Sequence, residues 1–513
     1  MGLGRIDNPF SIARHGVGRI ANPSNIRRCI MSASMKPARW YDFISINLFW
    51  LGLNIRNNAV GAIFLPYLVA QFVRPEVRNT ALGEIRTAGL VIAMLVQPAM
   101  GLLSDRSLSR FGRRRPFIFV GVLLDLVFLA FMALAFNYWV LLIAVLLLQF
   151  SSNISHGALQ GLIPDLVPEG QRGLASAVKA IFELLPLVLL GFTIAALVGA
   201  GQFGWAVIAT GVSLLVIMLL TIILVHETPL KEKPDVPLAP TMLRVVGMLA
   251  GIVAGAAAGL LAGGVVGGLG GLAAWPLAGK GFALDFGVAL GGVTAMAVAV
   301  LAGVWAGTLT TIGREAKRQP SFTWWVVNRL MFLSAITSIQ GFAPFFLMYA
   351  FDISRETAAG MTGKLMTAVG AFTLLSALPS GWLSDRFGQK RLISLSGFLA
   401  AAGTAVVLFT IWLPDIKLIY IAGSILGLAT GLFVTTNWAL GTRLVPHKEA
   451  GRYLGLSNLA GAGAGMVGSG LGGPIADYLN ARLPGLGYFV IFAGYGILFL
   501  LSSASLLGVS DVS

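Results

Sequence analysis

Cysteine and charge are the two things that this chain has least of. Cys29 is the only cysteine among 513 residues, which excludes an intramolecular disulfide and leaves little basis for a cysteine-based metal site. Charged residues make up only 11% of the chain and hydrophobic residues 57%, and the mean hydropathy is +0.84. A water-soluble domain of this composition would have too little polar surface to face water. The composition therefore predicts a membrane protein.

Short motifs of common enzymes are also missing. No P-loop, HExxH, GxSxG or CxxC motif occurs. A GxGxxG pattern begins at Gly463, but it lies inside a glycine-rich apolar stretch. It lacks the preceding strand and the acidic residue about 20 positions later that dinucleotide binding requires. We therefore expect no enzymatic activity, no cofactor and no metal.

Long apolar runs recur from Phe43 to the C-terminus. Each is long enough to cross roughly 30 Å of hydrocarbon at about 1.5 Å per residue. They predict an all-α polytopic membrane protein with about 14 transmembrane helices. The predicted spans are 43 to 73, 84 to 103, 116 to 136, 138 to 163, 173 to 199, 202 to 226, 241 to 275, 284 to 312, 322 to 350, 358 to 383, 391 to 412, 416 to 440, 452 to 478 and 486 to 509.

The formal net charge is +15. In a soluble protein this excess would suggest nucleic acid, but here Lys and Arg gather in alternate loops, as the positive-inside rule expects. The basic loops lie at 106 to 115, 314 to 318 and 386 to 391. An even number of spans then places both termini in the cytoplasm, with residues 1 to 42 as a basic tail. We expect a multi-pass protein of the inner or plasma membrane that contacts lipid and binds no nucleic acid.

Two local echoes indicate that the chain consists of two similar halves. GLLSDRSLSRFGRRRPF begins at Gly101 and GWLSDRFGQKR begins at Gly381, an offset of 280 positions. PDLVPEGQRG and RLVPHKEAGR align at Val167 and Val445, an offset of 278 positions. The same offset pairs Pro66 with Pro344, each late in an opening span, where a proline can kink the helix.

The offset divides the spans into six plus six, with two left over between them. We expect an N-terminal bundle at 43 to 226, a C-terminal bundle at 321 to 510, and a cytoplasmic linker with an inserted transmembrane hairpin at 227 to 320. The hairpin opens with GLLAGGVVGGLGGL, whose glycines allow close approach between two helices. Its expected role is packing or lipid contact.

The pattern G-x-L-x-D-R-x-G-R-R after the second span of each half resembles the signature loop of the major facilitator superfamily. That resemblance implies two pseudo-symmetric six-helix bundles around a central substrate site that opens alternately to either side. The longer first loop, SDRSLSRFGRRRPFI, and the stretch GALQGLIPDL resemble those of sucrose and other disaccharide proton symporters. Those carriers place a proton-coupling aspartate where this sequence has Gln149, so proton symport is not implied here, and a proton gradient, a sodium gradient and the solute gradient alone all stay open as the driving force.

A gate is the favoured interpretation of the two signature loops. Asp105 ends its span where its charge could face the positive N-terminus of the helix that begins near Gly451. The alternative is that these residues only set topology, although topology needs no acid there. The gating candidates are Gly101, Asp105, Arg113, Arg114, Gly381, Asp385 and Arg386.

Polar residues at membrane depth are costly and tend to mark a pathway. Here they follow helical faces, as in the spacing of four and three between Gln149, Asn153 and His156. Trp438 beside Asn437 would suit a sugar ring, although packing is the commoner role of a membrane tryptophan. The candidate substrate-binding residues are Asn54, Arg56, Asn57, Asn58, Gln149, Asn153, His156, Gln340, Asn437 and Trp438.

Three charged residues are candidates for ion coupling. Lys179 and Glu183 are four positions apart on one span and can form an ion pair. Glu183 and Asp125 both lie near the middle of their spans. Either acid can carry a proton or act as a static brace between helices.

The sequence therefore predicts a secondary active transporter that moves a small polar solute, such as a di- or oligosaccharide, by alternating access. Its expected partners are a small-molecule substrate and a proton or sodium ion, and it is expected to work as a monomer. Two alternatives stay open. One is a multidrug or amphiphile exporter, and the other is a non-transporting protein that delivers a cofactor or assembles a membrane complex.

Overall fold

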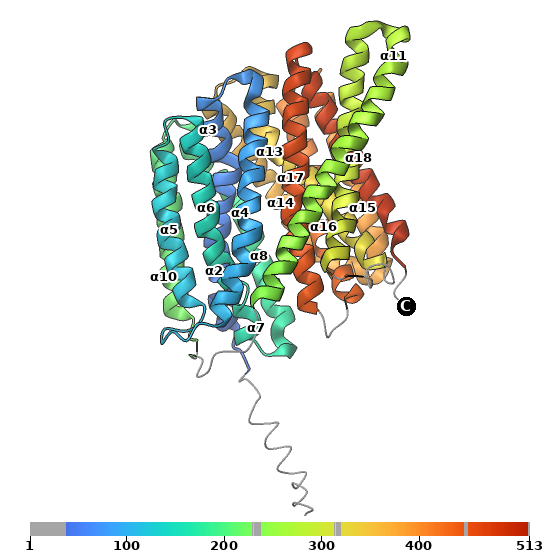
Figure 1. Cartoon of the computed structure of the whole chain (residues 1–513). Coiled ribbons are helices and arrows are strands. Elements are labelled where there is room, and N and C mark those ends of the chain that lie inside the picture. Colours follow the sequence, from blue (N-terminus) through green and yellow to red (C-terminus); the bar gives the residue numbers. More distant parts are fainter. Residues whose placement is uncertain are drawn as a thin grey trace, which may run out of the picture.

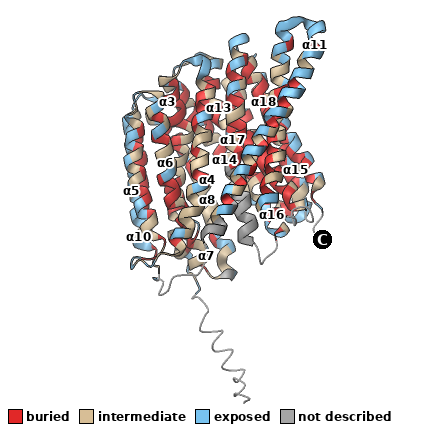
Figure 2. Ribbon diagram, viewed as in Figure 1, coloured by how far each residue is buried: buried red, intermediate tan, exposed pale blue. Residues whose placement is uncertain are grey.

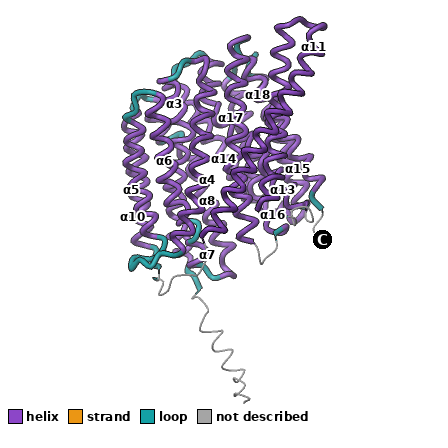
Figure 3. The backbone as a smooth tube through the Cα atoms, in the orientation of Figure 1, coloured by secondary structure: helices purple, strands orange, loops and turns teal. Residues whose placement is uncertain are grey.

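The computed structural model describes residues 37–227, 229, 238–311, 313, 320–445 and 450–510. Residues 1–36, most of the expected basic tail, lie outside the described residues. Within the described part of the chain, helices and the loops between them account for the whole fold, and no strand occurs (Figure 3).

The N-terminal bundle begins with a helix that changes its winding. α2 (Trp40–Asn58) continues as the π-helical segment η1 (Ala59–Phe64) and then as α3 (Leu65–Phe72). Pro66 lies just after η1 and cannot donate a backbone hydrogen bond, so the helix is irregular where a kink was expected. The bundle also contains the 3-10 turns η2 (Pro75–Val77) and η3 (Glu169–Gln171), and the helices α4 (Arg78–Asp105), α5 (Arg115–Ala133), α6 (Tyr138–Leu159), α7 (Leu162–Leu166), α8 (Arg172–Leu190), α9 (Ile194–Gly199) and α10 (Phe203–Leu224).

The C-terminal bundle consists of longer, uninterrupted helices, which lie beside the N-terminal bundle in Figure 1. They are α13 (Pro320–Phe351), α14 (Arg355–Phe387), α15 (Gln389–Phe409), α16 (Ile416–Leu444), α17 (Ala450–Arg482) and α18 (Leu486–Ser505), followed by the 3-10 turn η5 (Leu506–Gly508). The two bundles meet through α4 against α17 and through α8 and α9 against α14.

The inserted segment forms the expected hairpin. α11 (Leu238–Thr311) runs as helix on both sides of Gly279, which bends it with a φ of 79° and a ψ of 170° that favour glycine. The two legs lie so close that a Cβ on Gly255 or Gly263 would meet the backbone of the opposite leg. The base of the hairpin packs on α13 and α17, where Met296 and Val300 are fully buried, and its tip projects past the bundles in Figure 1.

Eleven stretches of the described residues are long and apolar enough to cross a membrane. One of them, Val245–Thr311, contains both legs of the hairpin. The spans expected at 43 to 73 and 452 to 478 are helical but are not among the eleven. Figure 2 shows exposed residues along the outer faces of α5, α10 and α11, and large apolar side chains such as Val127, Trp205 and Leu277 lie there. The chain is therefore a multi-pass membrane protein with a largely apolar outer surface.

Candidate functional site

The two bundles touch each other at the end of the molecule that lies far from the loop joining α4 and α5. A Cβ on Gly83 of α4 would meet the backbone of Ser469 in α17, and a Cβ on Gly473 would meet the backbone of Asn79. Asp477 adds polar contacts, because its Oδ2 accepts from the backbone N–H of Thr80 at 2.7 Å and its Oδ1 from Asn79 Nδ2 at 2.7 Å. This end, which we call the latch end, is closed.

The second contact between the bundles runs along one face of α14. Gly370 lies against the backbone of α8, and Gly363 lies against Gly191, just after α8, and Ala195 of α9. Between them, the Oγ1 of Thr367 donates to the carbonyl oxygen of Val188 at 2.9 Å and accepts from the N–H of Gly191 at 3.2 Å. Tight glycine packing of this kind holds the two helices close over the half of α14 near the latch end.

Toward the loop end, where the α4–α5 loop lies, the same face of α14 has no close neighbour among the residues that the structure describes. Gly381 continues the line of Gly363 and Gly370 at helical spacing, yet no atom of the described residues outside its own helix turn lies within 4 Å of the Cβ it would carry. Leu378 on this face is 73% exposed. On α8, Ser176 is likewise exposed. The bundles therefore diverge toward the loop end, and the space between them opens there.

The predicted amide stripes of α2 and α6 lie in the N-terminal bundle, half-buried or buried. Asn54, Asn58 and Asn153 each donate through Nδ2 to the carbonyl oxygen four residues earlier, at 2.7 to 2.9 Å. Gln149 lies against Gly89 of α4, where a Cβ would come within 3.0 Å of its side chain. With their amide N–H groups turned along the helix, the asparagines keep oxygens that can accept from hydroxyl groups.

Arg56 donates through Nη1 to Asn57 Oδ1 at 3.0 Å, and its other contacts lie inside the bundle. Its Nη2 donates to Asp125 Oδ1 on α5 at 2.7 Å and to the carbonyl oxygen of Leu148 on α6 at 3.0 Å. Ser151 donates to the same carboxylate oxygen at 2.8 Å. The side chains of Arg56 and Asp125 are only 3% and 2% exposed. In this conformation they tie three helices of one bundle together.

The second charged pair is more accessible. Lys179 Nζ lies 3.2 Å from Glu183 Oε1, and each side chain is about one third exposed. Lys179 also lies 4.0 Å from the centroid of the Trp50 ring, which in turn meets His156 edge-on at 5.3 Å. Side chains of α2, α6 and α8 thus form one polar cluster. It lies beside the face of α8 that packs on α14.

The candidate residues of the C-terminal bundle differ in how far they are buried. Asn437 is fully buried, and its Nδ2 donates to Asn328 Oδ1 at 2.7 Å. Trp438 is 37% exposed and Gln340 is half-buried. Helical spacing alone could not tell which neighbour of the pair 437 and 438 faces the bundle's own core.

Two arginines at membrane depth were missed by the sequence analysis. Arg329 on α13 lies 5.2 Å over the Trp438 ring and donates to Asn437 Oδ1 at 3.2 Å. Arg86 on α4 donates to the carbonyl oxygen of Gly61 at 2.7 Å, where the π-helical winding of η1 leaves that carbonyl free. A single basic residue inside an apolar run was the available signal for both.

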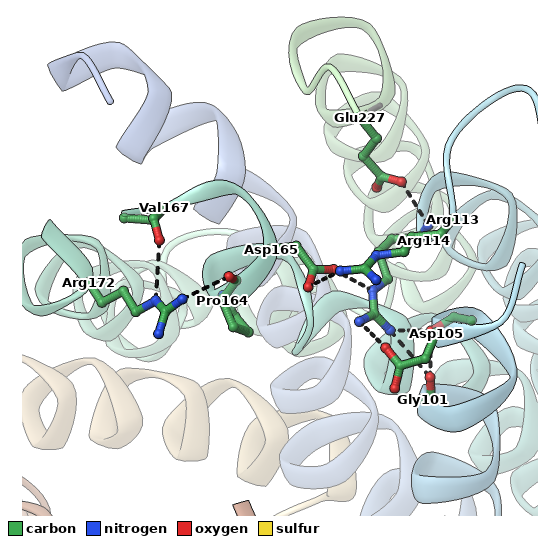
Figure 4. Close-up of polar contacts among 10 residues, drawn as sticks. Gly101, Asp105, Arg113, Arg114, Pro164, Asp165, Val167, Arg172 and Glu227 are labelled. Atoms are coloured by element: carbon green, nitrogen blue, oxygen red, sulfur yellow. Dashed lines mark hydrogen bonds and ion pairs between the residues drawn. The ribbon is translucent and has the colours of Figure 1, made fainter. Parts of the chain in front are cut away.

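The signature loop of the N-terminal half gathers its charges around Arg114 (Figure 4). This buried side chain forms ion pairs with Asp105 and with Asp165, whose Oδ2 accepts from Arg114 Nε at 2.9 Å. Arg113 also pairs with Asp165. A Cβ on Gly161 would collide with the guanidinium of Arg114, so the glycine makes room for it. The loop after α4 is thereby fixed to α7, which follows α6.

Gly101 and Glu227 complete this cluster. Gly101 faces Gly157, and α4 and α6 come so close that a Cβ on Gly157 would lie 2.9 Å from the Gly101 nitrogen. Glu227, which the sequence analysis missed, accepts through Oε2 from the backbone N–H of Arg114 at 2.8 Å and so caps the start of α5. Burial raises the pKa of Glu227 above its usual value, although these hydrogen bonds oppose the shift.

The C-terminal half does not build the same cluster. Asp385 and Arg386 are exposed, and within the described residues Asp385 forms no ion pair. Arg386 lies 5.6 Å over the Trp382 ring. The repeat offset of 278 positions aligns Arg443 with Asp165 of the first half. The alignment of FGQKR with FGRRR in the two signature loops places Lys390 at the position of Arg114. The side chains at the start of α17 lie outside the described residues, so the expected contact of Asp105 with that helix stays a prediction.

Curated relatives match limited segments of the chain. The minor myo-inositol transporter IolF of Bacillus subtilis (strain 168) is 28% identical over 136 residues, 26% of this chain and 30% of the relative. The galactose-proton symporter of Escherichia coli (strain K12) is 28% identical over 164 residues, 32% and 33% of the two chains. A sucrose transport protein of Oryza sativa subsp. japonica is 29% identical over 140 residues, 22% and 26%. The chain thus matches about a third or less of the length of each relative.

Solved structures match the whole fold. A mutant form of the nucleoside transporter NupG superposes with a TM-score of 0.61 at 12% identity, covering 90% of this chain and 99% of that one. A POT family transporter in complex with 5-aminolevulinic acid gives 0.63 at 13%, covering 92% and 97%. The model of the Major Facilitator Superfamily matches residues 53–333 and 326–510. With two six-helix bundles that meet at one end and part at the other, the chain belongs to the major facilitator superfamily, a family of membrane transporters.

Proposed function

We propose that this protein is a secondary active transporter that moves a small polar solute, a sugar or sugar-like polyol, through the space between its two bundles. The observation that carries the proposal is the divergence of α8 and α14 at the loop end while the latch end stays closed. A carrier that works by alternating access needs two such states.

The basic loops indicate the side of the membrane to which this conformation is open. Arg106, Arg110, Arg113 and Arg115 lie at the loop end, and so do Arg386 and Arg391 of the second half. By the positive-inside rule this end faces the cytoplasm, and both termini lie on that side. The conformation is then open to the cytoplasm, and the substrate binds between the bundles from there or leaves there.

The amide oxygens of α2 and α6 and the exposed ring of Trp438 support a sugar as the solute. Hydroxyl groups donate to amide oxygens, and the apolar face of a sugar ring packs on an indole. The names of the matched inositol, galactose and sucrose transporters agree with this class of solute. The half-exposed pair of Lys179 and Glu183 is the proposed coupling site for a proton or sodium ion, because its charge can change without unfolding a buried brace.

Uptake by proteoliposomes tests the proposal. Galactose, myo-inositol and sucrose are offered with and without an imposed proton or sodium gradient, and lipophilic cations are offered as competitors. We expect ion-dependent uptake of at least one polyol and no competition by lipophilic cations. Asn58→Leu and Asn153→Leu should abolish this uptake, whereas Gln71→Leu, at an exposed amide at the end of α3, should not. Transport of lipophilic cations alone would make the protein an exporter instead.

A further inference from the structure

Arg329 has no acidic partner within the described residues. It lies nine residues after the start of α13, roughly 14 Å along the helix at about 1.5 Å per residue, and therefore inside the membrane. One guanidinium nitrogen donates to Asn437 Oδ1 at 3.2 Å, and the group lies over Trp438. Its Nε is buried without a hydrogen-bond partner. Both contacts are to neutral groups, so the positive charge of Arg329 is not balanced by them.

Among the other charges near the space between the bundles, Arg56, Lys179 and Glu183 are paired, whereas Arg86 of α4 lies against Gly341 of α13 and donates to the carbonyl oxygen of Gly61. Arg56 is neutralised by Asp125 inside the N-terminal bundle. Glu183, on the other side of the space, is the carboxylate whose charge acts on Arg329, but it is held by Lys179 at 3.2 Å. Lys179, Glu183 and Arg329 together therefore leave one net positive charge.

An uncompensated arginine at membrane depth is costly and is tolerated where it serves a ligand or a pathway. The planar guanidinium matches the two oxygens of a carboxylate in a fork geometry that lysine cannot offer. A single positive charge balances a carboxylate, whereas a phosphate monoester carries about −1.5 to −2 and would leave negative charge unpaired. Trp438 is 37% exposed, and the part of its ring system that the guanidinium leaves uncovered offers an apolar surface for the ring that bears the carboxylate.

We propose that the substrate is a sugar acid, whose carboxylate binds Arg329 and whose ring packs on Trp438. This inference rests on the proposed transport function and narrows its substrate class. The amide oxygens of α2 and α6 then receive the hydroxyl groups on the opposite side of the substrate. Arg329 is a specificity residue in this arrangement, because it separates a sugar acid from the neutral sugar of the same shape.

The test compares galacturonate with galactose, two probes that differ in one carboxylate. Binding to the purified protein is measured by thermal shift, and uptake is measured in proteoliposomes. We expect galacturonate to bind at least tenfold more tightly than galactose, which corresponds to about 1.4 kcal/mol. Arg329→Gln should remove this preference. Arg329→Lys, which keeps the charge but loses the fork, should retain part of it.

Arg482→Gln is the matched control. Arg482 is another arginine of the C-terminal bundle that lies over an aromatic ring, at 5.7 Å from Tyr478, but it is exposed near the latch end. It should leave the ratio of galacturonate to galactose affinity unchanged. If Arg329→Gln does not fold, the ratio in the parent protein and in Arg329→Lys still decides the question.

Three outcomes overturn the inference. Binding and uptake of galactose without galacturonate would leave the transporter proposal standing and remove the sugar acid. Equal weakening of both probes by Arg329→Gln would make the arginine a structural or gating partner of Glu183. Uptake of neither probe nor of any other polyol would remove the proposed function itself.

Discussion

Arg114 donates through Nε to Asp165 at 2.9 Å, which joins the loop after α4 to α7. The second half has Arg443 in place of Asp165, and two cations cannot form that tie. The two signature loops therefore differ in mechanical role although their sequences echo each other. In the first half the loop is part of the bundle, and in the second half Asp385 and Arg386 are exposed and available to other partners.

Asp165→Asn should destabilise the protein, because it removes the carboxylate shared by Arg113 and Arg114 while Arg114 stays buried. Asp105 still pairs with Arg114, so we expect a loss of about 1–3 kcal/mol rather than the larger cost of a fully orphaned buried charge. Asp385→Asn, at an exposed acid, should change stability by less than about 0.5 kcal/mol. Thermal unfolding in detergent measures both. Equal melting temperatures for the two variants would show that the Arg114 cluster contributes nothing to stability.

Glu227 gives stability a specific dependence on pH. Its pKa is raised by burial, so the folded protein binds this proton more tightly than the unfolded chain does. The ionised form therefore costs stability above the raised pKa, and that cost disappears as the pH falls through it toward the ordinary value for glutamate. Glu227→Gln has no such charge and can still accept from the Arg114 N–H.

The expected measurement is the difference in melting temperature between the parent and Glu227→Gln from pH 8 down to pH 4.5. The parent should gain on the variant as the pH falls. If the difference stayed constant or moved the other way, the hydrogen bonds to the ionised carboxylate would stabilise it at least as much as its burial destabilises it.

Most of the architecture could be predicted from the sequence because it depends on local sequence patterns. Apolar runs marked the helices, the repeat offset separated the bundles from the hairpin, and the spacing of Lys179 and Glu183 anticipated their ion pair. The glycines of the insert anticipated the close approach of its two legs. These features need only residues a few positions apart, or a comparison of the chain with itself.

The contacts that the sequence could not show depend on distant segments. Glu227 accepts from the backbone N–H of Arg114, which is 113 positions away in the sequence. The residues around Glu227 carry no pattern that would predict a contact with the start of α5. Arg56 was placed with the asparagines beside it, but successive residues of a helix point in different directions, and its partner Asp125 lies on another helix. Arg329 was overlooked because its environment is created by α13 and α16 together.

Asp477 should control the balance between the two open states. Its carboxylate holds Asn79 and Thr80 at the first turn of α4, where the helix dipole favours negative charge. Asp477→Asn weakens this contact, and a loss of about 1.4 kcal/mol shifts a two-state equilibrium roughly tenfold. The shift should favour the state that is open at the latch end and closed at the loop end.

A single cysteine in place of Leu378, in a Cys29→Ser background, reports this shift, because Leu378 lines the open loop end. Labelling by a membrane-impermeant maleimide added on the loop-end side should become slower in Asp477→Asn. Asp352→Asn is the control. Asp352 is an exposed acid that follows the last residue of α13 at the latch end, and this variant should be labelled at the same rate as the parent. Unchanged labelling of Asp477→Asn would remove Asp477 from the latch.

The tip of the hairpin should be dispensable, but its base should not. Met248, Met296 and Val300 at the base belong to the buried core beside α13 and α17, and Trp305 meets Trp324 edge-on at 6.3 Å. The tip contributes the ion pair between Asp285 and Arg482, at 3.6 Å, with side chains that are 24% and 46% exposed. Surface pairs of this kind are worth about 0–1 kcal/mol.

Replacing residues 264 to 290 with a short Gly-Ser turn should therefore change stability by less than about 1 kcal/mol and leave transport intact. Replacing 238 to 316 with a flexible linker removes the base as well, and α13 and α17 then lose packing that lipid chains, being as apolar as the helix, do not replace specifically. We expect that longer deletion to lower the melting temperature markedly. If both variants melted and transported alike, the contacts of the base would have no part in holding the two bundles together.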